Sequence, residues 1–223
     1  MKNHFRYSYL FILAFFSLSF MSCDKEETDN LSRITTYPII AVKGEQFTSI
    51  PVGGTFKDEG VSATVGGAEI ESVKSGDAVD VNTPGVYIIT YTATNPDGFS
   101  VSANRYVGVI APDAEALDLT GNYKRNAGAL GVSKVTKLGP GHYTSDNIGG
   151  VAVGGPATTV HFFHTTGKTL IVPEQENAGG TFAAINASYN FGDPAATPPV
   201  PASYTWTVIN AGYGAAPRTF VKQ

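Results

Sequence analysis

Short apolar segments separated by turn residues run through most of the chain, and this pattern limits it to an all-β fold. Residues 86–94 are the clearest case, because Ile89 and Tyr91 recur on every second position with other apolar residues. Such alternation places successive side chains on opposite faces of a strand. A turn at residues 95–98 and a second alternating run at 100–110 follow. We therefore predict a long hairpin there.

Two β-rich parts are predicted, one at residues 35–111 and one at residues 118–223. The stretch between them, residues 111–117, is rich in Ala, Pro and acidic residues and has the composition of a linker. The first part is built around the long hairpin, which suits the centre of a sandwich. The second contains about seven or eight short strands joined by Gly-rich turns, which predicts an antiparallel barrel or a sandwich. The pattern does not decide between those two.

The N-terminus has the features of a secretory signal peptide at residues 1–22. Lys2 and Arg6 are followed by a charge-free, apolar run at residues 7–21. That run of about 15 residues fits a signal sequence and falls short of the roughly 20 that a membrane-spanning helix needs. A small residue, Ser22, then precedes Cys23, as it does where lipoprotein signal peptidase cleaves. An ordinary signal peptide followed by an incidental Cys is the alternative.

Lipidation of Cys23 is the consequence that we expect from this arrangement. Cys23 is the only Cys in the chain, so its acylation leaves no free thiol and no disulfide in the mature protein. The acidic stretch that follows resembles the export signal that sends Bacteroidetes lipoproteins to the outer face of the outer membrane. Residues 23–34 are thus predicted to be a lipidated acidic tether, with a plain spacer as the alternative. The predicted location is the outer membrane, facing the cell exterior.

Charge and motifs exclude several classes of function. The formal net charge is −4 and no stripe of Lys and Arg occurs, which argues against nucleic acid as a partner. The chain has no nucleophile elbow, no zinc-protease motif and no phosphate-binding loop. His161 and His164 are close in sequence, but odd spacing on a strand puts them on opposite faces, so they cannot share a metal. Glu174 and Glu176 are better explained as a solvated face. We expect no enzymatic activity, no metal site and no cofactor.

Three aromatic residues near the C-terminus are the candidate ligand-binding residues. Trp206 and Tyr204 lie on the same face of a predicted strand, and Tyr213 follows in a Gly-flanked turn. Flat aromatic rings offer sugars a large apolar platform, and the indole N–H can donate a hydrogen bond. Alternatively, Trp206 is the central core residue of the second domain. Two long loops, residues 149–156 and 191–201, could shape a binding cleft beside these rings.

Several segments of the first part resemble a known family. They are Pro38-Ile39-Ile40, the run from Val52-Gly53-Gly54-Thr55-Phe56 to Val61-Ser62-Ala63, and the block Asn82-Thr83-Pro84-Gly85-Val86-Tyr87 with the strand after it. Together they are similar to the bacterial surface immunoglobulin-like domain, which also occurs in some pesticidal crystal proteins. The resemblance implies an immunoglobulin-like sandwich that serves as a spacer or an adhesive module.

Residues 118–223 resemble the C-terminal domains of uncharacterised Bacteroides lipoproteins, on the Gly121-Asn122-Tyr123 opening and the closing pair of strands. Genes for such proteins lie beside starch-utilisation-type transport systems. The resemblance implies a non-catalytic surface lipoprotein that binds a glycan or supports a nutrient uptake complex in the outer membrane. A structural or adhesive surface protein without a small ligand is the alternative, and fold resemblance alone does not choose between them.

Overall fold

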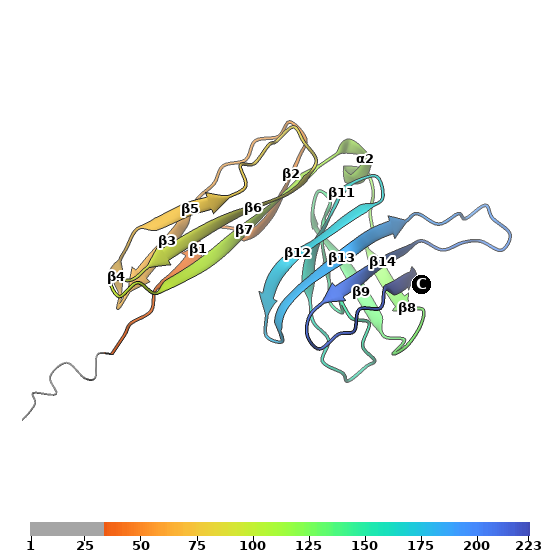
Figure 1. Cartoon of the computed structure of the whole chain (residues 1–223). Helices are drawn as coiled ribbons and strands as arrows, with labels where there is room; N and C mark the ends of the chain where they lie inside the picture. The colour runs from red at the N-terminus through yellow and green to blue at the C-terminus, as the bar shows by residue number, and fades with distance from the viewer. Residues whose placement is uncertain (1–33) are drawn as a thin grey trace, which may run out of the picture. The chain divides into compact units, whose positions relative to one another are not determined.

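The computed structural model describes residues 34–223, and nearly every element in them is a β-strand (Figure 1). The predicted all-β class is confirmed. The predicted signal peptide, Cys23 and the acidic residues after it lie outside the described residues. Within residues 34–223, no helix is long and apolar enough to cross a lipid bilayer.

Two sheets form the immunoglobulin-like part. The three-stranded sheet has the order β1-β3-β4, and the four-stranded sheet has the order β2-β7-β6-β5. The strands are β1 (Ile39–Val42), β2 (Phe47–Pro51), β3 (Val61–Val65), β4 (Ala68–Glu69), β5 (Ser72–Gly76), β6 (Gly85–Thr94) and β7 (Ser100–Ile110). The predicted hairpin is β6–β7, which pairs antiparallel without a break in register. The alternating apolar residues face the core as predicted, since Ile89 and Tyr91 of β6 pack with Val107 of β7 between the two sheets.

The chain crosses from one sheet to the other between β1 and β2. β1 pairs antiparallel with β3, whereas β2 pairs parallel with β7 in the opposite sheet. The side chain of Arg105, on β7, is buried and holds the crossing in place. Its guanidinium donates hydrogen bonds to the carbonyl oxygens of Lys43 and Glu45. Because buried polar groups must be paired, these bonds fix where β2 begins.

The second part is a closed barrel in which each strand is hydrogen-bonded to its neighbours in the sequence and β15 returns to β8 (Figure 1). The sequence left a barrel and a sandwich open for this part, and the structure shows the barrel. Its eight strands are β8 (Gly121–Arg125), β9 (Val132–Gly139), β10 (His142–Ser145), β11 (Val160–Thr166), β12 (Thr169–Asn177), β13 (Gly180–Asn190), β14 (Ser203–Ile209) and β15 (Arg218–Lys222).

One barrel strand contains a proline. β12 runs through Pro173 and ends at Asn177. Proline lacks the N–H that a ladder needs, so it is tolerated in a strand mainly at bulges. The pairing of β12 with β13 shifts register between Val172 and Gln175, which accommodates the proline.

Side chains fill the barrel interior. Its core combines aromatic rings with smaller apolar residues, and the rings belong to Tyr123, Tyr143, Phe162, Phe182, Tyr189, Tyr204, Trp206 and Phe220. The long loop at residues 149–156 begins against this core, since the carbonyl of Ile148 accepts a hydrogen bond from the indole N–H of Trp206 at 2.9 Å. Small eight-stranded barrels either fill their interior in this way or hold one small ligand.

A third, smaller core joins the two parts within the compact unit Tyr37–Gln223. Tyr106 and Ile110 of β7 pack there against Phe163 of β11 and Ala114. Ala114 belongs to α2 (Pro112–Glu115), a short helical turn in the stretch predicted as a linker. The hydroxyl of Tyr106 also donates a hydrogen bond to the carbonyl of Glu174 on β12. The boundaries predicted for the two domains, 35–111 and 118–223, remain predictions.

Candidate functional site

Two of the three predicted ligand-binding residues lie inside the barrel. Trp206 is fully buried and Tyr204 is 2% exposed, and their ring centroids are 4.5 Å apart. Tyr204 also stacks on Phe220 at 4.7 Å. Neither ring presents a face to a ligand outside the barrel. Both rings therefore lie in the barrel core, where the alternative interpretation placed Trp206, and their role in ligand binding stays a prediction.

Tyr213 is partly buried, and neighbours cover its ring. The guanidinium of Arg218 lies 5.0 Å from the ring centroid, and Phe182 meets the ring edge-to-face at 5.8 Å. A Cβ placed on Gly149 would come within 2.0 Å of the Tyr213 ring, so the loop backbone packs directly against it. Tyr213 is therefore a packing residue at the end of the barrel, and the three predicted residues do not form a common open platform.

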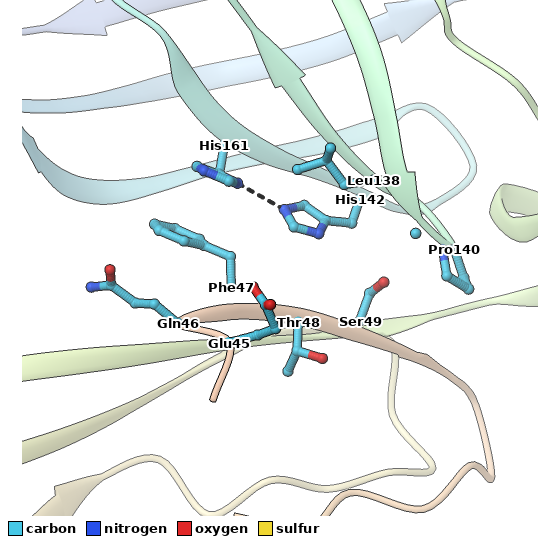
Figure 2. Close-up of a pocket in the computed structure, with 10 residues that line it drawn as sticks. Glu45, Gln46, Phe47, Thr48, Ser49, Leu138, Pro140, His142 and His161 are labelled. Atoms are coloured by element: carbon cyan, nitrogen blue, oxygen red, sulfur yellow. Dashed lines mark hydrogen bonds between the residues drawn. The ribbon is translucent and has the colours of Figure 1, made fainter. Parts of the chain in front are cut away.

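A groove of about 730 Å³ lies beside β2. One wall is the segment Glu45–Ser49, which leads into and forms most of β2. The other wall consists of the β9–β10 turn at residues 138–140 together with His142 and His161. Figure 2 shows Phe47 and Ser49 on the side of β2 that faces the histidines, while Thr48 points away. The volume lies in the range of about 300–1,000 Å³ that is usual for ligand sites.

Stacked rings anchor one end of this groove. Phe47 lies parallel to Tyr106 at 4.5 Å and parallel to His161 at 4.0 Å, so both of its faces are covered. His142 in turn stacks on Phe163 at 4.8 Å. Such ring pairs add about 0.5–1.5 kcal/mol each beyond the apolar area they bury. They fix β2 against β10 and β11, and they leave neither face of the Phe47 ring free to stack on a sugar.

The two histidines are joined by a hydrogen bond of 3.0 Å between Nε2 of His142 and Nδ1 of His161 (Figure 2). Burial, and then the neighbouring imidazole of His161, lowers the pKa of His142 to about 4. Burial lowers the pKa of His161 as well, against the opposing effect of the Glu45 carboxylate. Both rings are therefore neutral near pH 7, with one ring N–H donating to the other ring's lone pair.

The geometry of this pair suits a shared proton better than a metal ion. The ring centroids are 5.2 Å apart while the two nitrogens are 3.0 Å apart, so the nitrogens lie between the rings and point at each other. Two histidines that bind one metal ion must instead point their nitrogen lone pairs at the ion, which lies off the line that joins the two nitrogens. In residues 34–223, no group of three or more His, Cys, Asp and Glu side chains is placed to hold a metal ion.

The histidine pair was missed at the sequence level because its members are 19 positions apart. The sequence drew attention to His161 and His164 instead. His164 is fully buried, and its Nε2 bonds the carbonyl of Gly167 at 2.7 Å, away from the groove. His142 begins β10, a four-residue strand that was not predicted, so nothing local placed it beside His161.

Comparison with known proteins supports the assignment of the first part. Residues 40–109 match the family model described as "Bacterial surface protein, Ig-like domain". The crystal structure of the lipoprotein BT2262 from Bacteroides thetaiotaomicron matches with 26% sequence identity and a TM-score of 0.39, covering 84% of this chain and 100% of that chain. The comparison with curated proteins gave no match.

The family match applies to residues 40–109, which are similar to an immunoglobulin-like domain of bacterial surface proteins, as the resemblance in the sequence implied. The two sheets observed in this part of the chain agree with that match. A closed eight-stranded barrel follows this domain and packs against β7 through the small shared core.

Proposed function

We propose that this chain is a non-catalytic lipoprotein of the outer membrane that faces the cell exterior and supports a starch-utilisation-type nutrient uptake complex through protein contacts. Lipid on Cys23 provides the anchor, because the sequence before it has the features of a lipoprotein signal peptide. The mature N-terminus of such a protein carries more than one acyl chain, which gives stable membrane attachment where a single chain would not.

The observation that carries the protein-contact role is the filled barrel. Trp206, Tyr204 and Phe162 are all at most 2% exposed and occupy the interior where other small barrels hold a ligand. Interactions of the barrel with other molecules must therefore use its outer surface. This arrangement favours a supporting role over capture of a small ligand inside the barrel.

Anchoring is tested by labelling with radioactive palmitate in a Bacteroidetes host. We expect the wild-type protein to be labelled and Cys23→Ala to be unlabelled and unprocessed, because only the thiol can accept the diacylglycerol. Ser22→Gly keeps a small residue at the cleavage site and is the matched control, which should be labelled as well as wild type. Equal labelling of Cys23→Ala and wild type would contradict the proposal.

Orientation and complex formation need two further measurements. Protease added to intact cells should digest the wild-type protein, and replacing residues 24–27 by Ala should protect it by leaving it in the periplasm. Crosslinking on intact cells should then join the wild-type protein to an outer-membrane transport protein. If the lipoprotein reaches the surface but is recovered without such a partner, the structural or adhesive alternative replaces the uptake role.

Glycan binding is the second candidate, and one exposed aromatic pair favours it. Tyr37 is 57% exposed and Phe99 is 45% exposed, and their rings meet edge-to-face at 5.2 Å beside the β6–β7 turn. Calorimetry with glycans selected on an array tests it. Phe99→Ala should abolish binding, whereas Phe191→Ala removes a similarly exposed ring on the barrel and should not. No heat of binding at millimolar glycan would remove this candidate.

A further inference from the structure

The outer edge of β2 is an unpaired strand edge. β2 lies at one end of the four-stranded sheet and pairs only with β7, in parallel. Tyr106 N–H bonds the carbonyl of Gln46 at 2.8 Å, and Val52 N–H bonds the carbonyl of Ile110 at 2.9 Å. In a parallel ladder the residues that bond the neighbouring strand alternate with residues that face away from it. The even-numbered residues of β2 therefore bond β7, and the backbone groups of Phe47 and Ser49 face outward.

That edge opens into the groove and not onto another strand. In the described part of the chain no further strand pairs with β2, and Glu45–Ser49 form one wall of the 730 Å³ groove. The opposite wall, at residues 138–140, contributes the exposed side chain of Leu138 and a Gly-Pro turn. An added strand would lie about 4.8 Å from β2, which is the usual spacing between paired strands. The groove thus places open space next to unpaired backbone donors and acceptors.

The usual protection of a strand edge is mostly missing here. Natural edge strands are shielded by lysines, prolines or bulges, which prevent pairing with other chains. β2 has no lysine, and its pairing with β7 runs from Phe47 to Pro51 without a shift in register. Pro51 is the only proline, and it stands at the end of the strand. The outward backbone groups of Phe47 and Ser49 are left able to pair with another strand.

Charge indicates what kind of segment would fit. Glu45 is the one carboxylate among the residues that line the groove, and none of those residues is Lys or Arg. The two histidines contribute no positive charge at neutral pH, since their N–H···N bond joins neutral rings. A bound segment with a basic side chain near Glu45 would therefore meet an opposite charge, and such complementarity favours the correct partner and its register.

We propose that the free edge of β2 is the docking site for an extended segment of a partner protein, which adds as a strand beside Phe47–Ser49 and carries a Lys or Arg opposite Glu45. This inference rests on the proposed role in protein contact and names the surface that performs it. Strand addition of this kind takes its affinity from main-chain hydrogen bonds and its selectivity from side-chain contacts.

The test uses the soluble protein from residue 24 onward and a displayed library of random linear peptides. We expect the selected peptides to be rich in β-branched and basic residues. Binding is then measured by fluorescence polarisation with Ser49→Pro, which removes the outward N–H but leaves the ladder to β7 intact. Affinity should fall about tenfold or more. Ser49→Ala keeps the N–H and is the matched control, which should bind as wild type does.

Two further measurements test the charge at Glu45 and the protection of backbone amides from hydrogen exchange. Glu45→Lys should weaken binding of the basic peptides, while Glu71→Lys makes the same charge change at an exposed position outside the groove and should not. Amide exchange at Phe47 and Ser49 should slow when the peptide is bound. This readout does not depend on any variant, so it remains decisive if Ser49→Pro fails to fold.

Three outcomes would overturn the inference. In the first, the library gives no peptide that binds. In the second, the selected peptides bind Ser49→Pro as well as they bind the wild-type protein. In the third, light scattering shows that the wild-type protein is a dimer and that Ser49→Pro is a monomer. The last would assign the edge to a second copy of this chain. None of these results affects the palmitate and surface-protease tests, so failure of the docking edge and failure of the anchored surface role can be told apart.

Discussion

Replacing Trp206 by Ala tests whether the barrel is held together by its filled interior. The indole is fully buried between Tyr204, Phe162 and Phe220, with ring centroids at 4.5, 5.7 and 5.8 Å. Its N–H also bonds the carbonyl of Ile148 at 2.9 Å. The substitution therefore removes the centre of an aromatic cluster and leaves a buried carbonyl without its donor.

The expected cost follows from these two losses. Truncating a buried Trp to Ala costs about 3–5 kcal/mol in free energy of unfolding, because the surrounding side chains close the cavity only in part. An unpaired buried carbonyl adds about 1–3 kcal/mol unless water reaches it. A domain of this size has a total of about 5–15 kcal/mol. Trp206→Ala should thus bring the barrel close to unfolding, and Trp206→Phe should fall between Ala and wild type.

Urea unfolding followed by far-ultraviolet circular dichroism measures the effect. Trp206 is the single Trp of the chain, so its fluorescence reports on the barrel of the wild-type protein, although not on the variant. Val153→Ala is the control, since Val153 lies on a barrel loop and is fully exposed, and it should change stability by less than about 0.5 kcal/mol. A loss below about 1 kcal/mol for Trp206→Ala would refute the filled-core reasoning and revive Trp206 as a ligand platform.

Two further predictions concern the contact between the barrel and β7. Because the pKa of His142 falls from 6.5 to about 4 on folding, the unfolded chain binds more protons between those values. Stability from the neutral pair with His161 should therefore be full above about pH 6.5 and fall as the pH drops towards 4, by up to about 1.4 kcal/mol per pH unit. Urea melts from pH 7 to 5 should show a smaller decline for His142→Gln than for wild type, and equal declines would contradict the assignment. Gly108→Val places a Cβ 2.5 Å from the Phe163 ring and should destabilise the protein by about 1–3 kcal/mol in the same assay. Gly85→Ala is its control, because its Cβ meets nothing closer than 3.9 Å, and similar effects of the two changes would show that the contact is not tight.

Most of the strands could be predicted because their signal is local. The second half of β6 alternates between buried and partly buried residues, at Ile89, Tyr91 and Ala93, and β14 occupies Ser203–Ile209 as the apolar pattern indicated. β10 could not be predicted, since three of its four residues are buried and no alternation results. β2 was missed for a different reason. Its parallel pairing with β7 depends on the crossing held by Arg105, which no local pattern contains.

The candidate site was less predictable than the fold because it depends on pairs distant in sequence. The ligand prediction began from Trp206 and Tyr204, which are conspicuous by type, and an aromatic residue in mid-strand does not by itself reveal whether it is buried. The groove instead combines β2 with His142 and His161. The residues that flank each of these in the sequence do not indicate that the three lie together. Only closure of the barrel and its contact with the sheet bring them together.

One local signal did contain information about that contact. Phe162 and Phe163 are consecutive on β11, so their rings point to opposite faces of the strand, yet both are fully buried. Phe162 fills the barrel, and Phe163 packs outside it against Tyr106 and Ile110. A barrel strand that is apolar on both faces must be covered from outside, because an exposed outer face would alternate with polar residues. The Phe-Phe pair therefore marks the strand against which β7 packs, and the free edge of β2 lies in the same sheet, next to β7.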